Sequence, residues 1–345
     1  MQLLVAVGVG GVGEVGGEIG GADALEEERG RGGVGAEVDA EHPQGERPPP
    51  RAVAARDLKR AAALAGENGF EKAFGSYEEM LEDPGTDLVY VATPNSLHAK
   101  HARMCLEAGK HVLCEKPFAT TEREAAEVFA LARSRGLFCG EAIWTRFLPS
   151  WRAIPGIVAS GRIGEPRLVE GSFAVPVSHK ARLADPALGG GALLDLGVYP
   201  LALAIAVFGE NPVRVAGNAA IAPTGVDDQS SFSLEWEGGR FAALSCSMSA
   251  AGGARGRIIG TEGFVELPQL VRCEELRIVR HPDTPEETLP FPFEFNGYEY
   301  EFVAAAAAIR AGMPECPEAP QSATLAAMRA MDALRASWGV RFPAD

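Results

Sequence analysis

Residues 88–117 read LVYVATPNSLHAKHARMCLEAGKHVLCEKP, and this stretch decides the fold. Residues 88–92 form an apolar run without alternation, which is typical of a parallel strand covered on both faces. Residues 98–107 have the pattern of a helix that Gly109 ends, and residues 111–114 have the pattern of the next strand. Strands and helices that alternate in this way predict βαβ units and a doubly wound parallel sheet.

The alternation continues on both sides of this stretch. Residues 52–55 predict a short buried strand, and Asp57 is a good N-cap for the helix after it. Thr121 and Glu124 form a capping box that opens another helix. The first helix is predicted to bury Leu58, Ala61, Ala62 and Ala65, and the second Ala125, Val128, Phe129 and Ala132.

Beyond about Glu141 the pattern changes to alternation with period two. Residues 232–236 and 241–244 flank a Gly238-Gly239 pair, which is a hairpin signal. Further strands are predicted at 167–175, 213–221, 257–259, 264–267 and 276–279, and helices at 192–208, 300–311 and 322–338. The sequence therefore predicts an α/β Rossmann-like domain followed by an α+β domain with a large, mostly antiparallel sheet.

Residues 1–50 do not share either pattern. They are rich in Gly, Glu and Pro and end in Pro48-Pro49-Pro50. Such a composition buries too little apolar surface to offset the entropy of ordering, so we expect most of residues 14–50 to be irregular or disordered. The expected organisation is an atypical segment 1–50, a dinucleotide-binding domain 51–141 and a substrate-binding and dimerisation domain 142–345.

The overall composition excludes several classes of protein. The net charge of −15 argues against nucleic acid or an anionic membrane as the main partner. No run of 18 apolar residues is present and the start lacks the basic region of a signal peptide, so we expect a cytoplasmic protein. Six scattered cysteines predict reduced thiols, and no His/Cys cluster has the spacing of a metal site.

A glycine motif follows the first apolar run. Residues 3–7 (LLVAV) precede Gly8, Gly10 and Gly13, as in the dinucleotide fingerprint. Glycines there let backbone N–H groups and a helix N-terminus approach a pyrophosphate. In so glycine-rich a segment the pattern also arises by chance, and no amphipathic helix follows it. A phosphate loop and a chance match are both open.

Two polar strings come directly after predicted parallel strands. Thr93, Asn95 and His98 follow the strand at 88–92, at the edge where doubly wound sheets bind ligands. The same residues would also serve as a turn and a helix N-cap. Glu115-Lys116-Pro117 follows the next strand, where a lysine can hold a substrate oxygen or tune a neighbouring acid. An exposed charge pair before a helix is the alternative.

A third string combines glycines with an acid and a phenol. Gly189-Gly190-Gly191 precedes Asp195 and Tyr199, which lie four residues apart and share one face of a helical turn. A carboxylate beside a phenol is a plausible proton-transfer pair. The alternative is a helix start, with Asp195 near the positive end of the dipole and Tyr199 packed below. Pro200 predicts a local bend.

The order and spacing of these strings, together with EAIWTRF at 141–147, resemble the glucose–fructose oxidoreductase / inositol dehydrogenase / MocA (Gfo/Idh/MocA) family. The branch that looks most similar is that of dimeric dihydrodiol dehydrogenase, also described as NADP-dependent D-xylose 1-dehydrogenase. The resemblance covers about residues 51–345. It implies a hydride transfer from a carbinol of a sugar or cyclic diol to NADP, with NAD possible. It also implies a homodimer formed through the open sheet.

The resemblance also implies roles for individual residues. Lys116, Asp195 and Tyr199 would be catalytic, with Tyr199 as the base and its pKa lowered by Lys116, and Trp144 would line the substrate pocket. In Ala55-Arg56-Asp57 after the second strand, Arg56 stands in place of an acid that would hold the ribose hydroxyl, and could pair with the 2′-phosphate of NADP. The cofactor would be bound by Gly8, Gly10, Gly13, Arg56, Thr93, Asn95, His98, Glu115, Lys116 and Arg146.

Residues 1–50 depart from the family, which has one strand, a glycine loop and a helix before the second strand. One hypothesis is that this stretch is out of frame. The alternative functions are a non-catalytic NAD(P)- or sugar-sensing protein on the same fold, or an inactive product with a damaged cofactor site. An acidic interaction tail is a further alternative for the first 50 residues.

Overall fold

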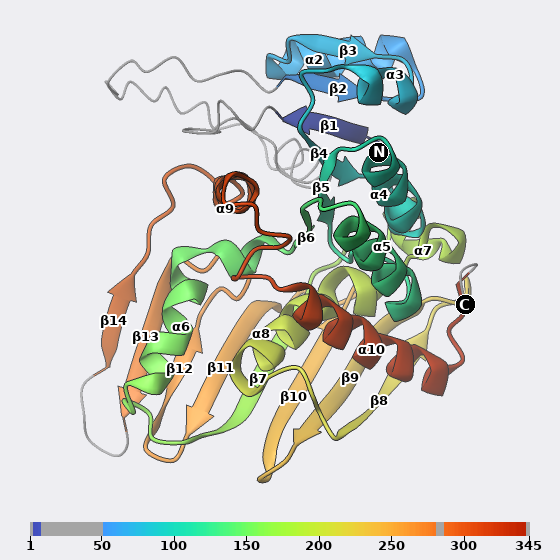
Figure 1. Cartoon of the computed structure of the whole chain (residues 1–345). Helices are drawn as coiled ribbons and strands as arrows, with labels where there is room; N and C mark the ends of the chain where they lie inside the picture. The colour runs from blue at the N-terminus through green and yellow to red at the C-terminus, as the bar shows by residue number, and fades with distance from the viewer. Residues whose placement is uncertain (1–2, 8–50, 281–285, 343–345) are drawn as a thin grey trace.

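The protein is described by a computed structural model over residues 3–7, 51–280 and 286–342 (Figure 1). It contains a six-stranded sheet of order β3-β2-β1-β4-β5-β6 and an eight-stranded sheet of order β14-β13-β12-β11-β7-β10-β9-β8. The predicted combination of a Rossmann-like domain and a C-terminal domain with a large, mostly antiparallel sheet is confirmed. The disorder and reading-frame hypotheses for residues 8–50 fall outside the described residues.

The first sheet and its helices follow the predicted alternation. The strands are β1 (Leu3–Val7), β2 (Ala52–Ala54), β3 (Lys72–Phe74), β4 (Leu88–Ala92), β5 (His111–Glu115) and β6 (Cys139–Ala142), and the helices are α2 (Leu58–Asn68), α3 (Tyr77–Glu82), α4 (His98–Glu107) and α5 (Glu122–Ser134). Every residue of β4 is buried, as expected of a strand covered on both faces. Because β4 and β5 are parallel, their carboxyl ends meet at one edge of the sheet.

The predicted helix caps are confirmed, but one predicted helix face is wrong. Asp57 caps α2 by accepting a hydrogen bond from the backbone N–H of Lys59, and Gly69 ends the helix in the left-handed conformation. In α2, however, only Ala61 and Ala65 are buried, while Leu58 is 56% exposed and Ala62 is exposed. In an alanine-rich helix two neighbouring faces have nearly the same apolar pattern, so sequence does not select between them.

β1 runs in the direction opposite to the one expected. It pairs antiparallel with both neighbours, so Val7 lies opposite Leu88, at the amino end of β4, and Leu3 lies opposite Ala92. A parallel pair needs a crossover connection, usually a helix, and residues 8–50 carry no helical pattern. A short apolar strand buries the same side chains in either direction. The chain therefore leaves β1 at the edge of the sheet opposite to the carboxyl ends of β4 and β5.

The second sheet is built from β7 (Pro166–Ala174), β8 (Arg214–Ile221), β9 (Asp227–Trp236), β10 (Arg240–Ser247), β11 (Gly253–Gly260), β12 (Gly263–Leu267), β13 (Glu275–Arg280) and β14 (Glu287–Pro290). β9 and β10 form the predicted hairpin, with Gly238 and Gly239 at positive φ. One neighbouring pair, β7 and β10, is parallel. All other pairs in this sheet are antiparallel.

Helices cover one face of this second sheet. The helices are α6 (Pro149–Ala159), α7 (Ala181–Ala184), α8 (Val198–Phe208), α9 (Glu299–Arg310) and α10 (Gln321–Trp338), and α6, α8 and α10 lie over the face seen in Figure 1. Alternate residues of β9 to β11, among them Ser231, Ser233, Ala243 and Arg255, are exposed, and Phe241 is 43% exposed. The exposed side chains alternate with those that form the core.

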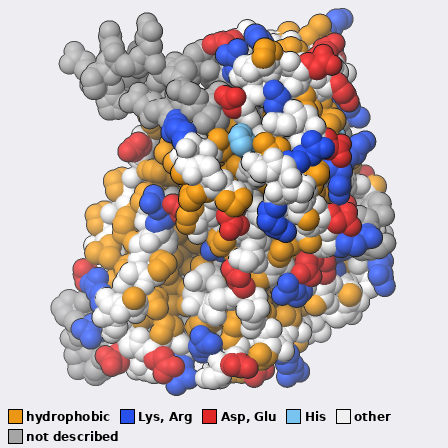
Figure 2. Space-filling view, in the orientation of Figure 1, with side chains coloured by type: hydrophobic (Ala, Val, Ile, Leu, Met, Phe, Trp, Pro, Cys, Tyr) orange, Lys and Arg blue, Asp and Glu red, His pale blue; other side chains and the backbone are white. Residues whose placement is uncertain are grey.

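The surface carries charges of both signs, and the most apolar helical segment is buried. Acidic and basic side chains are interspersed over the face shown in Figure 2. Among the described residues, one stretch, Pro186–Phe208, is long and apolar enough to span a membrane by composition alone. Since 89% of its most apolar window is buried inside the fold, it packs as a core segment and is weak evidence for a membrane span.

Candidate active site

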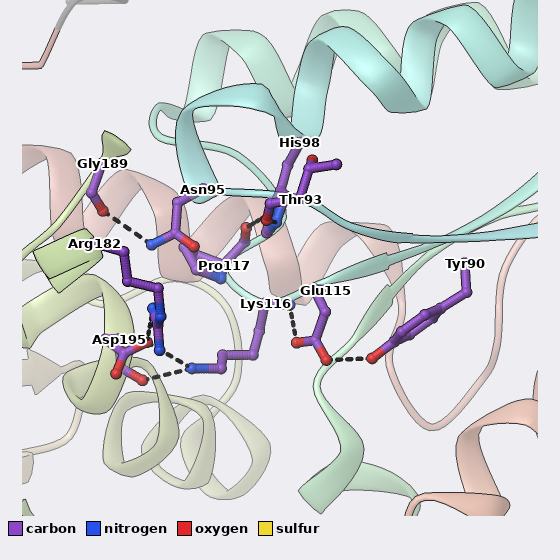
Figure 3. Close-up of polar contacts among 10 residues, drawn as sticks. All are labelled: Tyr90, Thr93, Asn95, His98, Glu115, Lys116, Pro117, Arg182, Gly189 and Asp195. Atoms are coloured by element: carbon purple, nitrogen blue, oxygen red, sulfur yellow. Dashed lines mark hydrogen bonds and ion pairs between the residues drawn. The ribbon is translucent and has the colours of Figure 1, made fainter. Parts of the chain in front are cut away.

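The predicted catalytic residues meet where the two sheets adjoin. Lys116 follows the carboxyl end of β5, while Asp195 lies in a π-helix, Leu193–Gly197, and Tyr199 lies in the first turn of α8. Figure 3 shows Lys116 and Arg182, from α7, both reaching Asp195. The structure thus brings together three residues that the sequence predicted as one unit and adds Arg182 to them.

Lys116 contacts Asp195 twice. Its Nζ donates to the backbone carbonyl of Asp195 at 2.8 Å and to the carboxylate Oδ1 at 3.2 Å. The side chains of Lys116 and Asp195 are only 12% and 8% exposed. Because both ends of this ion pair are shielded from water, the ammonium group is held in one place.

The carbonyl of Asp195, which accepts from Lys116, lies in an irregular stretch of helix. In a π-helix a carbonyl accepts from the N–H five residues later, and for Asp195 that residue is Pro200, which has no N–H. The expected bend near Pro200 thus takes the form of a π-helix that joins directly onto α8. The Asp195 carbonyl oxygen in this irregular stretch accepts the hydrogen bond from Lys116 Nζ.

The charges of this group support one another. Arg182 donates to Asp195 Oδ1 at 3.3 Å, so the carboxylate lies between two cations. Burial alone would raise the pKa of Asp195, but Lys116 and Arg182 outweigh it and hold that pKa below its usual value. Burial alone would lower the pKa of Lys116, but Asp195, Tyr199 and Glu115 together raise it. Lys116 is therefore an ammonium ion and Asp195 a carboxylate at neutral pH.

Tyr199 lies beside this charged group in an aromatic environment. Lys116 Nζ is 5.1 Å from the centre of the Tyr199 ring, and Phe173 packs edge-on against it. Burial raises the pKa of Tyr199 to about 12, although Lys116 and a hydrogen bond with the Trp144 side chain both lower it. The expectation of a lowered pKa is wrong for the protein alone, because removing the phenolate from water outweighs one nearby cation.

Trp144, the predicted pocket residue, lies in an aromatic cluster, and its contact with substrate stays a prediction. Its ring stacks on Tyr298 with centroids 4.3 Å apart, and Phe293 packs against its edge. A Cβ at Gly297 would lie 2.8 Å from the Trp144 ring, so glycine is needed there for close approach. Together with Tyr199 these side chains form an aromatic wall beside Lys116.

Glu115 lies behind Lys116 and faces Tyr90. Its carboxylate accepts hydrogen bonds from the Tyr90 hydroxyl and from the backbone N–H of Lys116, the latter at 3.0 Å. Burial raises the pKa of Glu115, although Lys116 lowers it. The carboxyl of Glu301 is completely buried close by, and both of its oxygens have no partner among the described residues. These contacts fix the turn that carries Lys116.

The loop after β4 is held by internal contacts. Asn95 Nδ2 donates to the carbonyl of Gly189 at 2.9 Å and so ties this loop to the glycine-rich segment. The ring of His98 lies between the carbonyls of Thr93 and Pro117, at 2.6 and 2.7 Å. Burial lowers the pKa of His98 to about 4, so the ring is neutral and donates to one of the two.

A cavity of about 530 Å³ opens at the carboxyl ends of β2 and β4. Its lining includes Arg56, Arg60, Pro94 and Arg182, with Ala55, Asp57 and Leu188 completing it. This is the edge where doubly wound sheets bind dinucleotides, and three guanidinium groups suit the phosphates of such a ligand. The residues present at this edge therefore fit a phosphorylated dinucleotide.

Other predicted site residues lie elsewhere or are not described. Arg146 donates from Nε to the carbonyl of Glu318 at 2.8 Å, so its guanidinium group binds the segment that precedes α10. Gly8, Gly10 and Gly13 lie outside the described residues. All six cysteines are free and buried, and the described part of the chain contains no group of three or more His, Cys, Asp or Glu side chains that could hold a metal.

Several residues of the site were not predicted from sequence. Arg60 lies in the first turn of α2, four residues after Arg56, and this spacing could have suggested that the two guanidinium groups lie near each other. Arg182 and Tyr298 lie in segments without a recognisable pattern, so their positions follow only from the tertiary structure.

Comparison with known proteins places both parts of this fold in one family. The oxidoreductase family with an NAD-binding Rossmann fold matches residues 30–142, and the Gfo/Idh/MocA C-terminal domain matches residues 151–266. The chain is 36% identical over 300 residues to trans-1,2-dihydrobenzene-1,2-diol dehydrogenase from Homo sapiens, covering 85% of this chain and 90% of the relative. The enzyme of the same name from Xenopus laevis is 35% identical over 298 residues, with the same coverage of both chains.

Solved structures show the same arrangement of domains. An NAD-binding oxidoreductase from Klebsiella pneumoniae is similar with a TM-score of 0.75 and 28% identity, covering 84% of this chain and 88% of that one. A 3-ketoreductase from Actinomadura kijaniata, solved with NADP and TDP-benzene, has a TM-score of 0.73 and 28% identity. The match covers 83% of this chain and 88% of that one. An aldose–aldose oxidoreductase from Caulobacter crescentus has a TM-score of 0.74 and 25% identity. The match covers 82% of this chain and 87% of that one.

Proposed function

The chain belongs to the Gfo/Idh/MocA family of oxidoreductases and is an NAD(P)-dependent dehydrogenase. From this premise we propose that it oxidises a carbinol of a sugar or cyclic diol with NADP. We propose Tyr199 as the base of this reaction. The relatives named dihydrodiol dehydrogenase support a diol, and the neighbour named aldose–aldose oxidoreductase supports a sugar. The catalytic group comprises Lys116, Asp195 and Tyr199.

In the proposed mechanism the chain's own residues manage the proton. NADP, held at the cavity lined by Arg56, Arg60 and Arg182, would supply the hydride acceptor for the carbinol carbon. The Tyr199 oxygen takes the hydroxyl proton as the C–O bond gains double-bond character. Lys116 stabilises the negative charge on the phenolate and the substrate oxygen. Its Nζ is held in position by the backbone carbonyl oxygen and the Oδ1 of Asp195. Trp144 and Tyr298 exclude water from that side.

The observation that carries the proposal is the buried group in which an ammonium ion lies beside the Tyr199 ring. Replacing Tyr199 with Phe should lower kcat by about 10²–10⁴-fold and leave the dissociation constant of NADPH within about twofold. Tyr300→Phe is the matched control and should behave as wild type. It removes a hydroxyl on α9 that accepts a hydrogen bond from the backbone N–H of Glu294. A Tyr199→Phe enzyme with wild-type kcat on diols and sugars would remove Tyr199 from the mechanism.

The preference for NADP is part of the proposal. Arg56 lies just before Asp57, the N-cap of α2, and Arg60 lies in the first turn of that helix, and both line the cavity after β2. Two guanidinium groups at this edge suit a 2′-phosphate better than a bare ribose hydroxyl. The proposed roles of Thr93, Asn95, His98 and Glu115 are to shape the cofactor edge through the contacts described above. Contact between Arg146 and the cofactor stays a prediction.

Assembly, domain boundaries and location are also proposals. The exposed face of the second sheet, with Phe241 and Ala243 on β10, is proposed as the interface of a homodimer. The boundary between the dinucleotide-binding and substrate-binding domains is proposed at 141/142, because β6 ends at Ala142 and the next strand, β7, belongs to the other sheet. We propose a cytoplasmic location on the basis of the sequence alone.

One observation favours an alternative function without catalysis. The reversed direction of β1 takes the chain away from the cofactor edge, and the family match begins at residue 30, beyond Gly13. A sensor or an inactive product would share this feature. Fluorescence titration with NADPH and NADH separates the cases, because micromolar binding with turnover supports the dehydrogenase. Binding without turnover supports a sensor, and a folded chain that binds neither cofactor has lost its site.

A further inference from the structure

We propose that Asp227 is a positioning residue that anchors the segment carrying Asp195 and Tyr199. This inference rests on the proposed function and names a residue that the family motifs leave unassigned. Asp227 is the first residue of β9, and its side chain has no exposed surface. Its Oδ2 accepts a hydrogen bond of 2.6 Å from the backbone N–H of Leu193.

Leu193 is the first residue of the π-helix. An N–H in the first turn of a helix has no partner within the helix, so a carboxylate placed there both satisfies it and fixes where the helix begins. Asp195 follows two residues later and Tyr199 six residues later. A shift of the helix start would therefore move both groups together.

The glycine before the helix is fitted to the same carboxylate. Gly191 has a φ of 116°, and a Cβ at this position would lie 2.3 Å from Asp227 Oδ1. Only glycine allows this backbone conformation and this approach. The third glycine of the run thus has a specific purpose, which is to let the chain close over Asp227.

The burial of the Asp227 carboxyl lowers the stability of the fold, so a compensating role is expected for it. Its Oδ1 has no hydrogen-bond partner among the described residues. Burial raises the pKa of Asp227 to about 7, although its hydrogen bond with Leu193 lowers it. A buried carboxyl with one unsatisfied oxygen destabilises the fold relative to an apolar side chain of the same size. In compensation, Asp227 fixes the residue at which the π-helix begins, and thereby the positions of Asp195 and Tyr199.

The test compares substitutions that keep or remove the acceptor. Asp227→Asn keeps an oxygen acceptor for Leu193, whereas Asp227→Val keeps the volume and removes it. We expect kcat to fall about 10²-fold in Asp227→Val, with the dissociation constant of NADPH within about twofold, and to stay within about threefold in Asp227→Asn. Asp228→Asn is the matched control, since the half-buried Asp228 contacts Ser249 instead, and it should behave as wild type.

Amide hydrogen exchange reads the anchoring without any turnover. In Asp227→Val, exchange should rise in a peptide covering residues 191–201 and not in α2, and Asp227→Asn should restore protection. A valine variant with wild-type kcat and wild-type protection overturns the proposal, as does an asparagine variant as impaired as valine. If the valine variant does not fold, the asparagine variant decides by the same two measurements. A wild-type chain without turnover would refute the proposed function, and the exchange data would still judge the anchor.

Discussion

Tyr199 is subject to two opposing effects whose balance decides how the enzyme responds to pH. Its burial raises the pKa to about 12, and Lys116 acts in the opposite direction. At pH 8 a phenol with such a pKa is ionised to about one part in ten thousand. A base that is mostly protonated still works, but its rate follows the small ionised fraction.

The pH dependence should therefore be one-sided. For alcohol oxidation, kcat/KM should rise about tenfold per pH unit from pH 7 to 10, because the required phenolate becomes more abundant. For carbonyl reduction, which needs the protonated phenol, the same ratio should be flat over this range. Initial rates in both directions check this, and Tyr199→Phe should abolish the slope. A plateau of oxidation at neutral pH would show that another group, or a strongly shifted Tyr199, is the base.

Arg60 should determine the choice between cofactors together with Arg56. Substituting Arg60 with Ala should raise the dissociation constant of NADPH by about 10–100-fold, because a charge-assisted bond to the 2′-phosphate is lost. The dissociation constant of NADH should change less than about twofold. Arg167→Ala, at an exposed position on β7, is the control. Equal losses for both cofactors would assign Arg60 to the shared part of the dinucleotide instead.

At the scale of elements, the junction between the π-helix and α8 is the part of the fold most directly tied to chemistry. Pro200 is buried there against β7, where a Cβ at Gly171 would lie 2.7 Å from the Pro200 Cβ. It has no N–H to offer the Asp195 carbonyl, and that carbonyl accepts from Lys116 Nζ. Restoring an N–H gives that carbonyl a competing partner inside the helix.

Pro200→Ala should consequently lower kcat about tenfold while leaving the melting temperature unchanged or higher, since a helix interior gains from losing a proline. Steady-state kinetics and thermal unfolding test this directly. Pro155→Ala in α6 removes a helical proline away from the site and should leave kcat unaltered. Should Pro200→Ala retain full activity, the carbonyl contact would have no part in placing Lys116.

Sequence patterns predicted most of these elements but not their irregularities. The helix at 192–208 was expected as one unit, while the structure begins it with a π-helix whose Asp195 carbonyl accepts from Lys116, a residue far away in sequence. Asp195 and Tyr199 were found because their spacing is local. Arg182 was not, because it meets Asp195 only through the tertiary fold. Similarly, LLVAV predicts a buried strand, and nothing in five apolar residues specifies its direction.

At the scale of the whole molecule, the exposed sheet face makes a prediction about assembly. Phe241→Glu should convert the proposed dimer to a monomer, because it places a charge in an apolar interface. Light scattering coupled to gel filtration measures the mass. Leu58→Glu, at a similarly exposed apolar residue on α2, should leave the mass unchanged. A wild-type chain that is monomeric at micromolar concentration would rule out this interface.

The reversed β1 has a consequence for how the molecule can be divided. β1 is hydrogen-bonded to β2 on one side and β4 on the other, so a chain beginning at Arg51 would have a vacant slot in the middle of its sheet. Both borders of such a slot are unpaired strand edges, which attract extended segments from other chains. The protein is thus a natural candidate for fragment complementation, with a short apolar peptide added in trans taking the place of residues 3–7.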